Sequence, residues 1–450
     1  ISPKYAGRMH RALSLYKNIF KVNNLPMHKY VKERGSYINP LYITEDETWD
    51  FAIKLYQDIH VESGTTLTIT NEVKMPVGGR IVVKPGAKLI IDGASITSAH
   101  DYPWQGIEVW GNSAQHQWPN SNGTYMQGYV ELNNAVIENA VCALNLWKPG
   151  DYTKTGGIAY STKTIFRNNE KSVHALVYRN FHPTNIKEME YNSWFDNCTF
   201  EITKDYHGIH TFYKHVDLNQ VNGMKFKGCD FNLSPEANNV SDYNQAIAAY
   251  SAGFKVEARC EGLTSPCNDW DRSTFNGFRV GVYAGNSGVN NNSYLINRAL
   301  FTGNSIGVLS NNVDNAIVIN SEFYSAKNQY NWEDCTYGIF VESGAGFTFE
   351  DNKFFKQAGA PLSNYIGIGA FNCETVSDIY KNEFTGLTAG NYAYGKNYPD
   401  FLYQGLEYIC NINTGNWADF YVKGKEDNFF IAIQSKQGST IIPARNQFSP

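Results

Sequence analysis

A short glycine-centred phrase recurs along this chain and constrains its fold more than any other feature. It reads "FRVGVYAGN" at 278–286, "NSIGVLSNN" at 304–312, "TYGIFVESG" at 336–344 and "YIGIGAFN" at 365–372, and "YHGIH" at 206–210 is similar. The glycines of the first four phrases are separated by 26, 31 and 29 residues. Such a period is typical of solenoid or propeller arrays. The sequence has neither a propeller-blade motif nor leucine-rich spacing, which favours a parallel β-helix.

The physical reason for such a repeat is that each turn of a β-helix contributes short strands that pair in parallel with the turns before and after it. Inward residues of successive turns then stack as ladders of Val, Ile, Leu and Phe. Turn positions need a tight or left-handed backbone, which Asn and Gly tolerate, and stacked asparagines can bond each other's amides. The sequence therefore predicts an all-β protein, a parallel β-helix, and the general rule for parallel crossovers makes it right-handed.

The first 45 residues differ from the rest. Met9, Leu13, Tyr16 and Phe20 follow helical spacing. Because the open end of a solenoid exposes strand edges and core, a cap is needed there. We predict a helical N-terminal cap over residues 1–45 and a β-helix over 46–450. The last residues stop inside a strand–turn pattern, which predicts that the β-helix continues beyond residue 450.

Composition excludes several function classes. The net charge is −5, so there is no basic footprint for nucleic acid. The sequence contains no run of 18 apolar residues, so it predicts no membrane-spanning helix. The sequence has no P-loop, dinucleotide fingerprint, GxSxG or HExxH motif. We expect no cofactor.

Eight cysteines are present, and none forms a CxxC pair, so we expect no zinc or other metal site. The segment "CEGLTSPC" predicts a small loop closed by a disulfide between Cys260 and Cys267. Cys198 and Cys229 occupy matching phrases, "FDNCTF" and "FKGCDF". They form either a disulfide between neighbouring turns or two buried thiols.

Alignment of the recurring strand gives two columns of outward residues. The first contains Glu108, Asn145, His174 and His210, followed by Ala248, Tyr283, Leu309, Phe340 and Gly369. The second contains Trp110, Trp147, Leu176, Phe212 and Tyr250, followed by Gly285, Asn311, Glu342 and Phe371.

Sugar rings stack on aromatic planes and bond amides and carboxylates, and turns lie about 4.8 Å apart, close to a sugar repeat. The glycan-binding candidates are Trp110, Trp147, Asn145, Phe212 and Tyr250. The alternative is that these rings only stabilise the sheet, or that the loops 111–128, 148–156 and 178–192 cover them.

A catalytic hypothesis rests on His174 and His210, which on adjacent turns could act as base and acid, with Glu108 nearby. A lyase acting on uronic acids also needs a cation, and Arg179 and Lys214 are near in sequence. The alternative is two ordinary surface histidines. Hydrolysis needs two carboxylates across a cleft, whereas the columns offer only Glu108 and the distant Glu342.

The order "HVESGTTLTI…VKMPVGGRIVVKPGAKLIIDGASIT…WQGIEVWGN", followed by the "NCTF", "GVYAGN" and "GIF" turns, resembles secreted right-handed parallel β-helix proteins with the pectate-lyase-like superfamily fold. Proteins of this kind are commonly exported by the type IX secretion system. The resemblance covers residues 50–450 and implies an extracellular or cell-surface, outer-membrane-attached location, with the export machinery as a partner.

Three functions follow from these observations. The first is a non-catalytic surface scaffold for adhesion or glycan binding, with a polysaccharide as partner. The second is a polysaccharide lyase or glycoside hydrolase that acts on the outward sheet face. The third is a structural surface or cargo module without a ligand.

Overall fold

A computed structural model describes residues 40–262, 265–331, 334–399, 405–424, 432–433, 437, 441 and 443–450. Every regular element of these residues is a β-strand. The strands begin with β1 at Leu41–Ile43, inside the range predicted as a cap. The rest of that range, residues 1–39 with the predicted helix, lies outside the described residues. In the part of the chain that the structure describes, no helix is long and apolar enough to cross a membrane.

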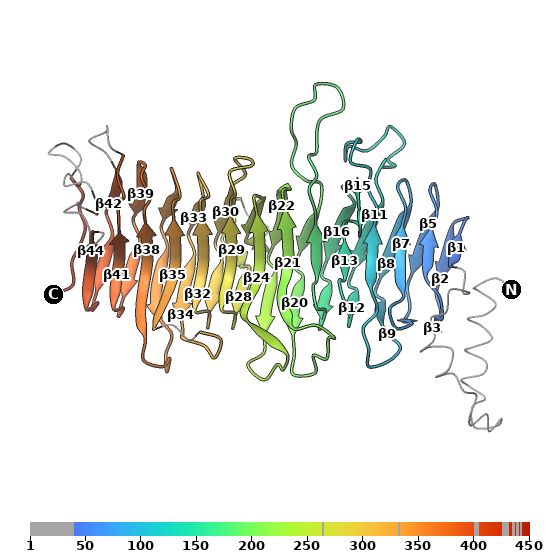
Figure 1. Ribbon diagram of the computed structural model, residues 1–450, viewed down its shortest axis with the longest axis horizontal. Helices are drawn as coiled ribbons and strands as arrows, with labels where there is room; N and C mark the ends of the chain where they lie inside the picture. Colours follow the sequence, from blue (N-terminus) through green and yellow to red (C-terminus); the bar gives the residue numbers. More distant parts are fainter. Residues whose placement is uncertain are drawn as a thin grey trace. The chain divides into compact units, whose positions relative to one another are not determined.

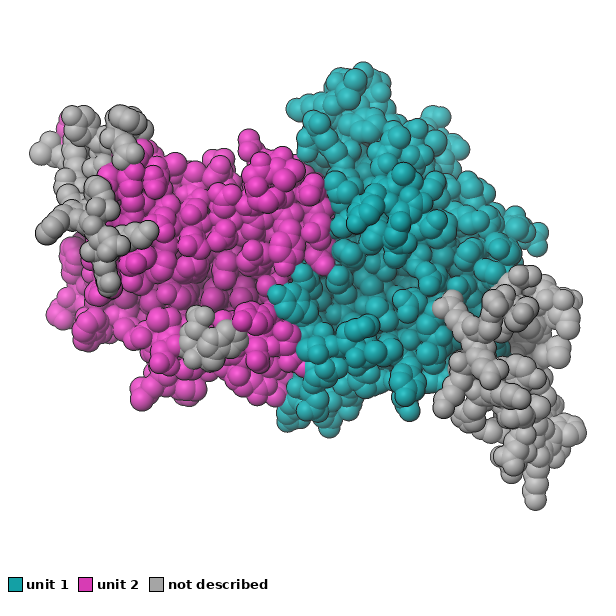
Figure 2. Space-filling model, in the orientation of Figure 1, with its two compact units in different colours: residues 1–216, 236–239 teal, residues 217–235, 240–450 magenta. Residues whose placement is uncertain are grey.

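The chain divides into two compact units, residues 1–216 with 236–239 and residues 217–235 with 240–450 (Figure 2). In unit 1, strands of successive turns pair in parallel in three sheets (Figure 1). The first sheet contains β1, β4 (Ile59–Val61), β7 (Arg80–Val83), β10 (Gly106–Val109), β13 (Leu144–Asn145) and β18 (Val173–Ala175). The second contains β2 (Glu47–Trp49), β5 (Thr66–Ile69), β8 (Lys88–Asp92), β11 (Tyr129–Asn133), β16 (Ile158–Thr162) and β19 (Trp194–Asp196). The third contains β3 (Ile53–Lys54), β6 (Val73–Met75), β9 (Ser95–Ser98), β12 (Val136–Glu138), β17 (Ile165–Arg167) and β20 (Thr199–Ile202).

Unit 2 repeats this arrangement. Its first sheet contains β24 (Val240–Tyr250), β29 (Val280–Gly285), β32 (Ile306–Asn311), β35 (Cys335–Glu342), β38 (Asn364–Phe371), β41 (Ala389–Tyr394) and β44 (Ala418–Lys423). The second contains β22 (Asn222–Lys227), β25 (Gly253–Glu257), β30 (Tyr294–Asn297), β33 (Ile317–Ile319), β36 (Thr348–Glu350), β39 (Ser377–Tyr380) and β42 (Leu406–Ile409). The third contains β23 (Asp230–Leu233), β28 (Thr274–Asn276), β31 (Leu300–Thr302), β34 (Glu322–Ser325), β37 (Lys353–Lys356), β40 (Glu383–Thr385) and β43 (Ile412–Thr414).

Three elements complete the inventory. Strand β21 (Phe212–Asn219) contributes residues to both units. Two antiparallel hairpins, β14–β15 (Trp147–Lys148 and Asp151–Thr155) and β26–β27 (Arg259–Cys260 and Trp270–Asp271), extend from the turns. One strand per sheet in each turn, with parallel pairing throughout the three sheets, confirms the predicted parallel β-helix; its right hand stays a prediction.

The core of unit 2 contains a stack of phenylalanines on the third sheet. Consecutive ring centroids lie 4.7 Å apart for Phe275 and Phe301, 4.6 Å for Phe301 and Phe323, 4.8 Å for Phe323 and Phe354, and 5.0 Å for Phe354 and Phe384. All five rings are buried. Each turn therefore adds one ring to a continuous stack.

This stack explains the recurring glycine. A Cβ atom on Gly307 would lie 2.6 Å from Cδ1 of Phe323 and 2.5 Å from the carbonyl oxygen of Gly338, and Gly281, Gly338 and Gly367 are crowded in the same way. None of these four residues has positive φ. These four glycines therefore leave room for a ring rather than supply left-handed turns. Left-handed turn positions are filled by asparagines such as Asn312 and Asn372 and by other glycines such as Gly303, as expected for these two residue types.

A ladder of buried asparagines runs along one corner of unit 2. Nδ2 of Asn352 donates to Oδ1 of Asn382 at 3.1 Å, and Nδ2 of Asn382 donates to Oδ1 of Asn411 at 3.3 Å. The same amides also bond the backbone of neighbouring turns, for example Nδ2 of Asn382 to the carbonyl of Phe349 at 2.8 Å. The predicted bonding between stacked asparagines is confirmed.

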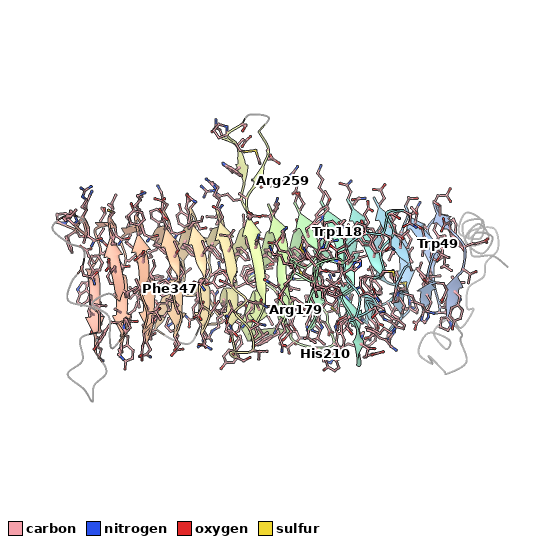
Figure 3. The ribbon with its side chains drawn as sticks, turned by 90° about the horizontal axis from the view of Figure 1, so that it is seen from above. Trp49, Trp118, Arg179, His210, Arg259 and Phe347 are labelled. Carbon is pink, nitrogen blue, oxygen red and sulfur yellow. A yellow bond between two sulfur atoms is a disulfide. The ribbon has the colours of Figure 1, made fainter. Side chains whose placement is uncertain are left out.

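The structure shows which of the candidate cysteine pairs form disulfides. Cys260 and Cys267 form the predicted disulfide, in the β26–β27 hairpin that projects from the ribbon beside the label of Arg259 (Figure 3). Cys198 and Cys229 are buried thiols, so the alternative disulfide between them is wrong.

Candidate functional site

The outward face of the first sheet in unit 1 brings together three predicted residues. Glu108 pairs in register with Asn145, and Asn145 with His174. This register confirms that part of the predicted column. Glu108 and Asn145 are nevertheless buried, with exposed fractions of 2% and 8%.

Glu108 is buried because its neighbours close around it. The guanidinium of Arg80 forms an ion pair with Oε1, and the indole nitrogen of Trp110 donates to Oε2 at 2.9 Å. Arg80 also lies 3.7 Å from Asp58. Both carboxylate oxygens of Glu108 are therefore engaged in holding Arg80 and Trp110, which does not fit the predicted role in proton transfer.

The two predicted tryptophans belong to the same network. The Nζ atom of Lys148 lies 4.8 Å from the ring centroid of Trp110. The indole nitrogen of Trp147 donates to Nδ1 of His174 at 3.3 Å, and the ring of Tyr152 lies 5.8 Å away. On the outward face of the first sheet in unit 1, both tryptophans are therefore held by contacts with neighbouring side chains.

His60, on β4 of the same face, is half-buried, and it should make the stability of the folded protein depend on pH. Burial lowers its pKa first, and the positive charge of Lys84 lowers it further. The unfolded chain, with a histidine pKa of about 6.5, then binds a proton more readily than the folded chain. The contribution of neutral His60 to stability is therefore fully present above the pKa of the unfolded chain, about 6.5, and is lost as the pH falls through the lower pKa of the folded chain.

We expect the wild-type urea midpoint to fall between pH 7 and pH 5, and to fall less in His60→Gln, because glutamine does not titrate. The measurement is urea unfolding of both proteins at the two pH values. An identical fall in both proteins would contradict this role of His60.

Two predicted residues do not lie on this face. His210 precedes β21, and its Nδ1 lies 2.6 Å from Oε2 of Glu170, while its backbone nitrogen donates to Oε1 at 3.0 Å. The side chain of His210, which is labelled in Figure 3, is 72% exposed. That of Glu170 is 6% exposed. Phe212 is fully buried and packs against His215 at 4.8 Å. The predicted outward positions of His210 and Phe212 are wrong, because His210 lies in the irregular segment before β21 and Phe212 begins that strand with its side chain buried.

The two cations suggested for a lyase are also placed. Arg179, which is labelled in Figure 3, lies on the loop 178–192. It pairs with Glu188 on the same loop at 2.7 Å. Lys214 is buried to 9% exposure, with its Nζ 5.0 Å from the ring centroid of Tyr213. In the part of the chain that the structure describes, no group of three His, Cys, Asp or Glu residues could hold a metal ion.

The face of the first sheet in unit 2 follows the predicted columns throughout. Tyr283, Leu309, Phe340 and Gly369 pair in register, and the column continues to Tyr392 and Tyr421. The second column pairs Tyr250, Gly285, Asn311, Glu342 and Phe371 and continues to Tyr394 and Lys423. Tyr250 is half-buried and lies 5.4 Å from Tyr283.

Five rings at one end of these columns form what we call the aromatic face: Phe340, Phe371, Tyr392, Tyr394 and Tyr421. The ring of Phe371 lies 4.8 Å from Phe340, 5.1 Å from Tyr392 and 5.1 Å from Tyr394, and Tyr392 lies 5.1 Å from Tyr421. Four of the rings are half-buried, and Tyr421 is 44% exposed. The face therefore presents a continuous row of ring surface to solvent.

Polar groups adjoin this row. Nδ2 of Asn311 donates to Oε2 of Glu342 at 3.0 Å, one turn before Phe371 in the same column, and Lys423 follows Tyr394. Burial raises the pKa of Tyr392, so its hydroxyl stays protonated at neutral pH. The arrangement can stack an apolar ring face and bond hydroxyl groups beside it.

Tyr392, Tyr394 and Tyr421 were missed by the sequence alignment, which ended at residue 372. The segment "AGNYAYG" at 389–395 carries the same alternation with a glycine in the same place. Extending the column by one turn would have found two of the three tyrosines.

Comparison with known proteins gives similarity at low identity. No family model matches the chain, and no curated protein matches it. Among solved structures, tailspike protein 3 of bacteriophage CBA120 is similar over 93% of this chain and 57% of that chain, with 11% identity and a TM-score of 0.36. The family 28 exopolygalacturonase of Yersinia enterocolitica is similar over 90% and 71%, with 10% identity and a TM-score of 0.24. The Streptococcus pneumoniae surface protein and adhesin PfbA is similar over 94% and 91%, with 11% identity and a TM-score of 0.19. This chain thus spans 57% of the tailspike's length, and its function has to be inferred from its own residues.

Proposed function

We propose that this protein is a secreted or cell-surface β-helix module that binds polysaccharide on the aromatic face of unit 2 without cleaving it. The observation that carries the proposal is the row of five contacting, solvent-accessible rings on adjacent turns. Because adjacent turns lie about 4.8 Å apart, successive rings can meet successive sugars of an extended chain.

The chemistry of this row favours a glycan over a purely apolar partner. Sugar rings present C–H groups that pack on aromatic planes, while their hydroxyls need hydrogen-bonding partners. Three of the five rings are tyrosines, and Glu342 and Lys423 flank them in the second column. Tyrosine combines an apolar ring with a polar tip and so suits such a surface.

Binding is favoured over cleavage by the positions of the candidate catalytic residues. Glu108 is engaged by Arg80 and Trp110, His174 accepts from Trp147, and His210 lies away from the sheet face. One observation supports an enzyme as the second candidate: the buried Glu170 orients the ring of His210, whose side chain is largely exposed, as an orienting carboxylate does for a general base.

The location is part of the proposal. The disulfide Cys260–Cys267 supports an oxidising compartment outside the cytosol. Export as a type IX cargo rests on the sequence resemblance alone. Fractionation of a strain that lacks this export machinery tests it, and unchanged surface display would contradict it.

The binding proposal is tested by retention of the protein on a panel of insoluble acidic and neutral polysaccharides. We expect Phe371→Ala and Tyr392→Ala to weaken retention about tenfold each, because each removes a stacking ring. Phe355→Ala is the matched control, since Phe355 is a half-exposed ring that stacks on Tyr324 on the third sheet of the same unit.

Retention that is unchanged in both aromatic-face variants would contradict the proposal. Release of reducing ends or unsaturated product, abolished in His210→Ala, would establish the enzyme instead. Absence of both retention and product would leave a structural module.

A further inference from the structure

We infer that unit 1 carries a second sugar site, a pocket of about 290 Å³ that takes one neutral pyranose ring. The residues that line the pocket include Gly64, Thr66, Gly86, Lys88, Tyr125 and Tyr129. The inference rests on the proposed function only for the class of ligand, because none of these residues belongs to unit 2.

Two tyrosines form the aromatic wall. The rings of Tyr125 and Tyr129 stack with centroids 5.1 Å apart and an interplanar angle of 16°. Tyr129 is buried at 7% exposure, whereas Tyr125 is half-buried and reaches the pocket from the loop 111–128. The inner ring thus fixes the outer ring in a position where a sugar can stack on it.

The loop that carries Tyr125 is held in place by Gln127. Its Nε2 donates to the carbonyl oxygen of Gln115 at 2.8 Å and of Asn112 at 3.1 Å, and its Oε1 accepts from the backbone nitrogen of Asn112 at 2.6 Å. Gln127 is fully buried. A loop fixed before binding loses little conformational entropy when a ligand arrives.

Three glycines line the pocket and leave space in it because they have no side chains. Gly64 and Gly86 have φ values of +82° and +79°, and the backbone nitrogen of Gly64 donates to the carbonyl oxygen of Gly86 at 3.0 Å. Apart from the glycine itself and its two chain neighbours, no residue has an atom within 4 Å of the position a Cβ would take on Gly64 or on Gly123. The space beside these backbones is therefore open to a ligand.

The size and charge of the pocket select the ligand. A volume of about 290 Å³ lies just below the usual range for ligand pockets, about 300–1,000 Å³, so one ring fits better than a chain. The ammonium of Lys88 lies 3.0 Å from Oε2 of Glu131. Burial raises the pKa of Glu131, but hydrogen bonds from Lys88 and Asn133, the positive charge of Lys88 and a hydrogen bond from Tyr129 together lower it, so this carboxylate is ionised and balances the ammonium. A neutral sugar, bonded by the Lys88 ammonium and the Thr66 hydroxyl, is therefore favoured over a uronic acid.

The test is calorimetric titration of the full chain with neutral hexoses, N-acetylhexosamines, glucuronate and galacturonate. We expect neutral sugars to bind with a dissociation constant on the order of 1 mM. Tyr125→Ala should weaken binding about tenfold, and Lys88→Met should weaken it as well. Tyr125→Phe retains the ring and should bind like the wild type, as should the control Tyr152→Ala, which changes an exposed tyrosine of the β14–β15 hairpin.

Three outcomes would overturn the inference: no binding of any neutral sugar at concentrations above 10-fold the expected constant of about 1 mM, binding of the uronic acids alone, or equal binding by the wild type, Tyr125→Ala and Lys88→Met. Phe371→Ala separates the two sites. It should weaken retention on polysaccharide while leaving the monosaccharide titration unchanged, so each proposal can fail alone.

Discussion

Replacement of Phe354 by alanine is expected to lower the free energy of unfolding by about 3–5 kcal/mol, because it interrupts a buried stack of rings. Phe354 is 1% exposed and lies between Phe323 at 4.8 Å and Phe384 at 5.0 Å. Its removal leaves a cavity in the buried core, between the rings of Phe323 and Phe384. Glycines at the facing positions cannot fill that cavity. The measurement is denaturant unfolding followed by aromatic fluorescence and far-ultraviolet circular dichroism.

The adjacent residue provides the control. Phe355 is half-exposed on the outer side of the same strand, so Phe355→Ala should cost less than about 1 kcal/mol. If both variants lose the same stability, the ring stack is not the source of the effect. A loss below about 1 kcal/mol in Phe354→Ala would also contradict the account.

Replacement of Asn382 by alanine is expected to cost on the order of 3 kcal/mol. Asn382 is fully buried, its Oδ1 accepts from the backbone nitrogen of Asn352 at 3.0 Å, and its Nδ2 donates to the carbonyl oxygen of Phe349 at 2.8 Å. Alanine leaves these two backbone groups buried without their partner. Each such group costs about 1–3 kcal/mol. The same unfolding experiment measures the loss.

Asn382→Asp separates the two halves of the amide. Aspartate keeps the acceptor toward Asn352 but at pH 7 replaces the donor with a negative oxygen that faces the carbonyl of Phe349. The aspartate variant should therefore lose at least as much stability as the alanine variant. Wild-type stability in Asn382→Asp would show that the amide donor contributes nothing.

The fold was predictable because a β-helix repeats its constraints once per turn. The alternation around "GVYAGN" and "GVLSNN" placed the first sheet of unit 2 in its observed register. The reason for the glycine was not predictable from its own phrase. It depends on a phenylalanine that follows in the chain by 16 residues for Gly307 and Phe323 and by 17 for Gly367 and Phe384, on another sheet, and only the three-dimensional stack brings the two together.

The candidate site was predicted less well, for two physical reasons. An irregular segment before β21 makes "YHGIH" imitate the repeat, so His210 was assigned to a strand that begins later, at Phe212, and Phe212 was assigned outward although its side chain is buried. Burial was also invisible: the alignment placed Glu108 outward correctly, but Arg80 and Trp110 close over its carboxylate. Outward direction on a sheet does not by itself mean exposure.

Hydroxyl-radical footprinting of the full chain, with and without a retained polysaccharide, tests the central claim most directly, because it reports the accessibility of individual aromatic side chains. We predict that the polysaccharide lowers oxidation of Phe371, Tyr392, Tyr394 and Tyr421 and leaves Tyr324 and Phe355 unchanged. Protection confined to Trp110 and Trp147 of unit 1, or no protection of any ring, would contradict binding at the aromatic face.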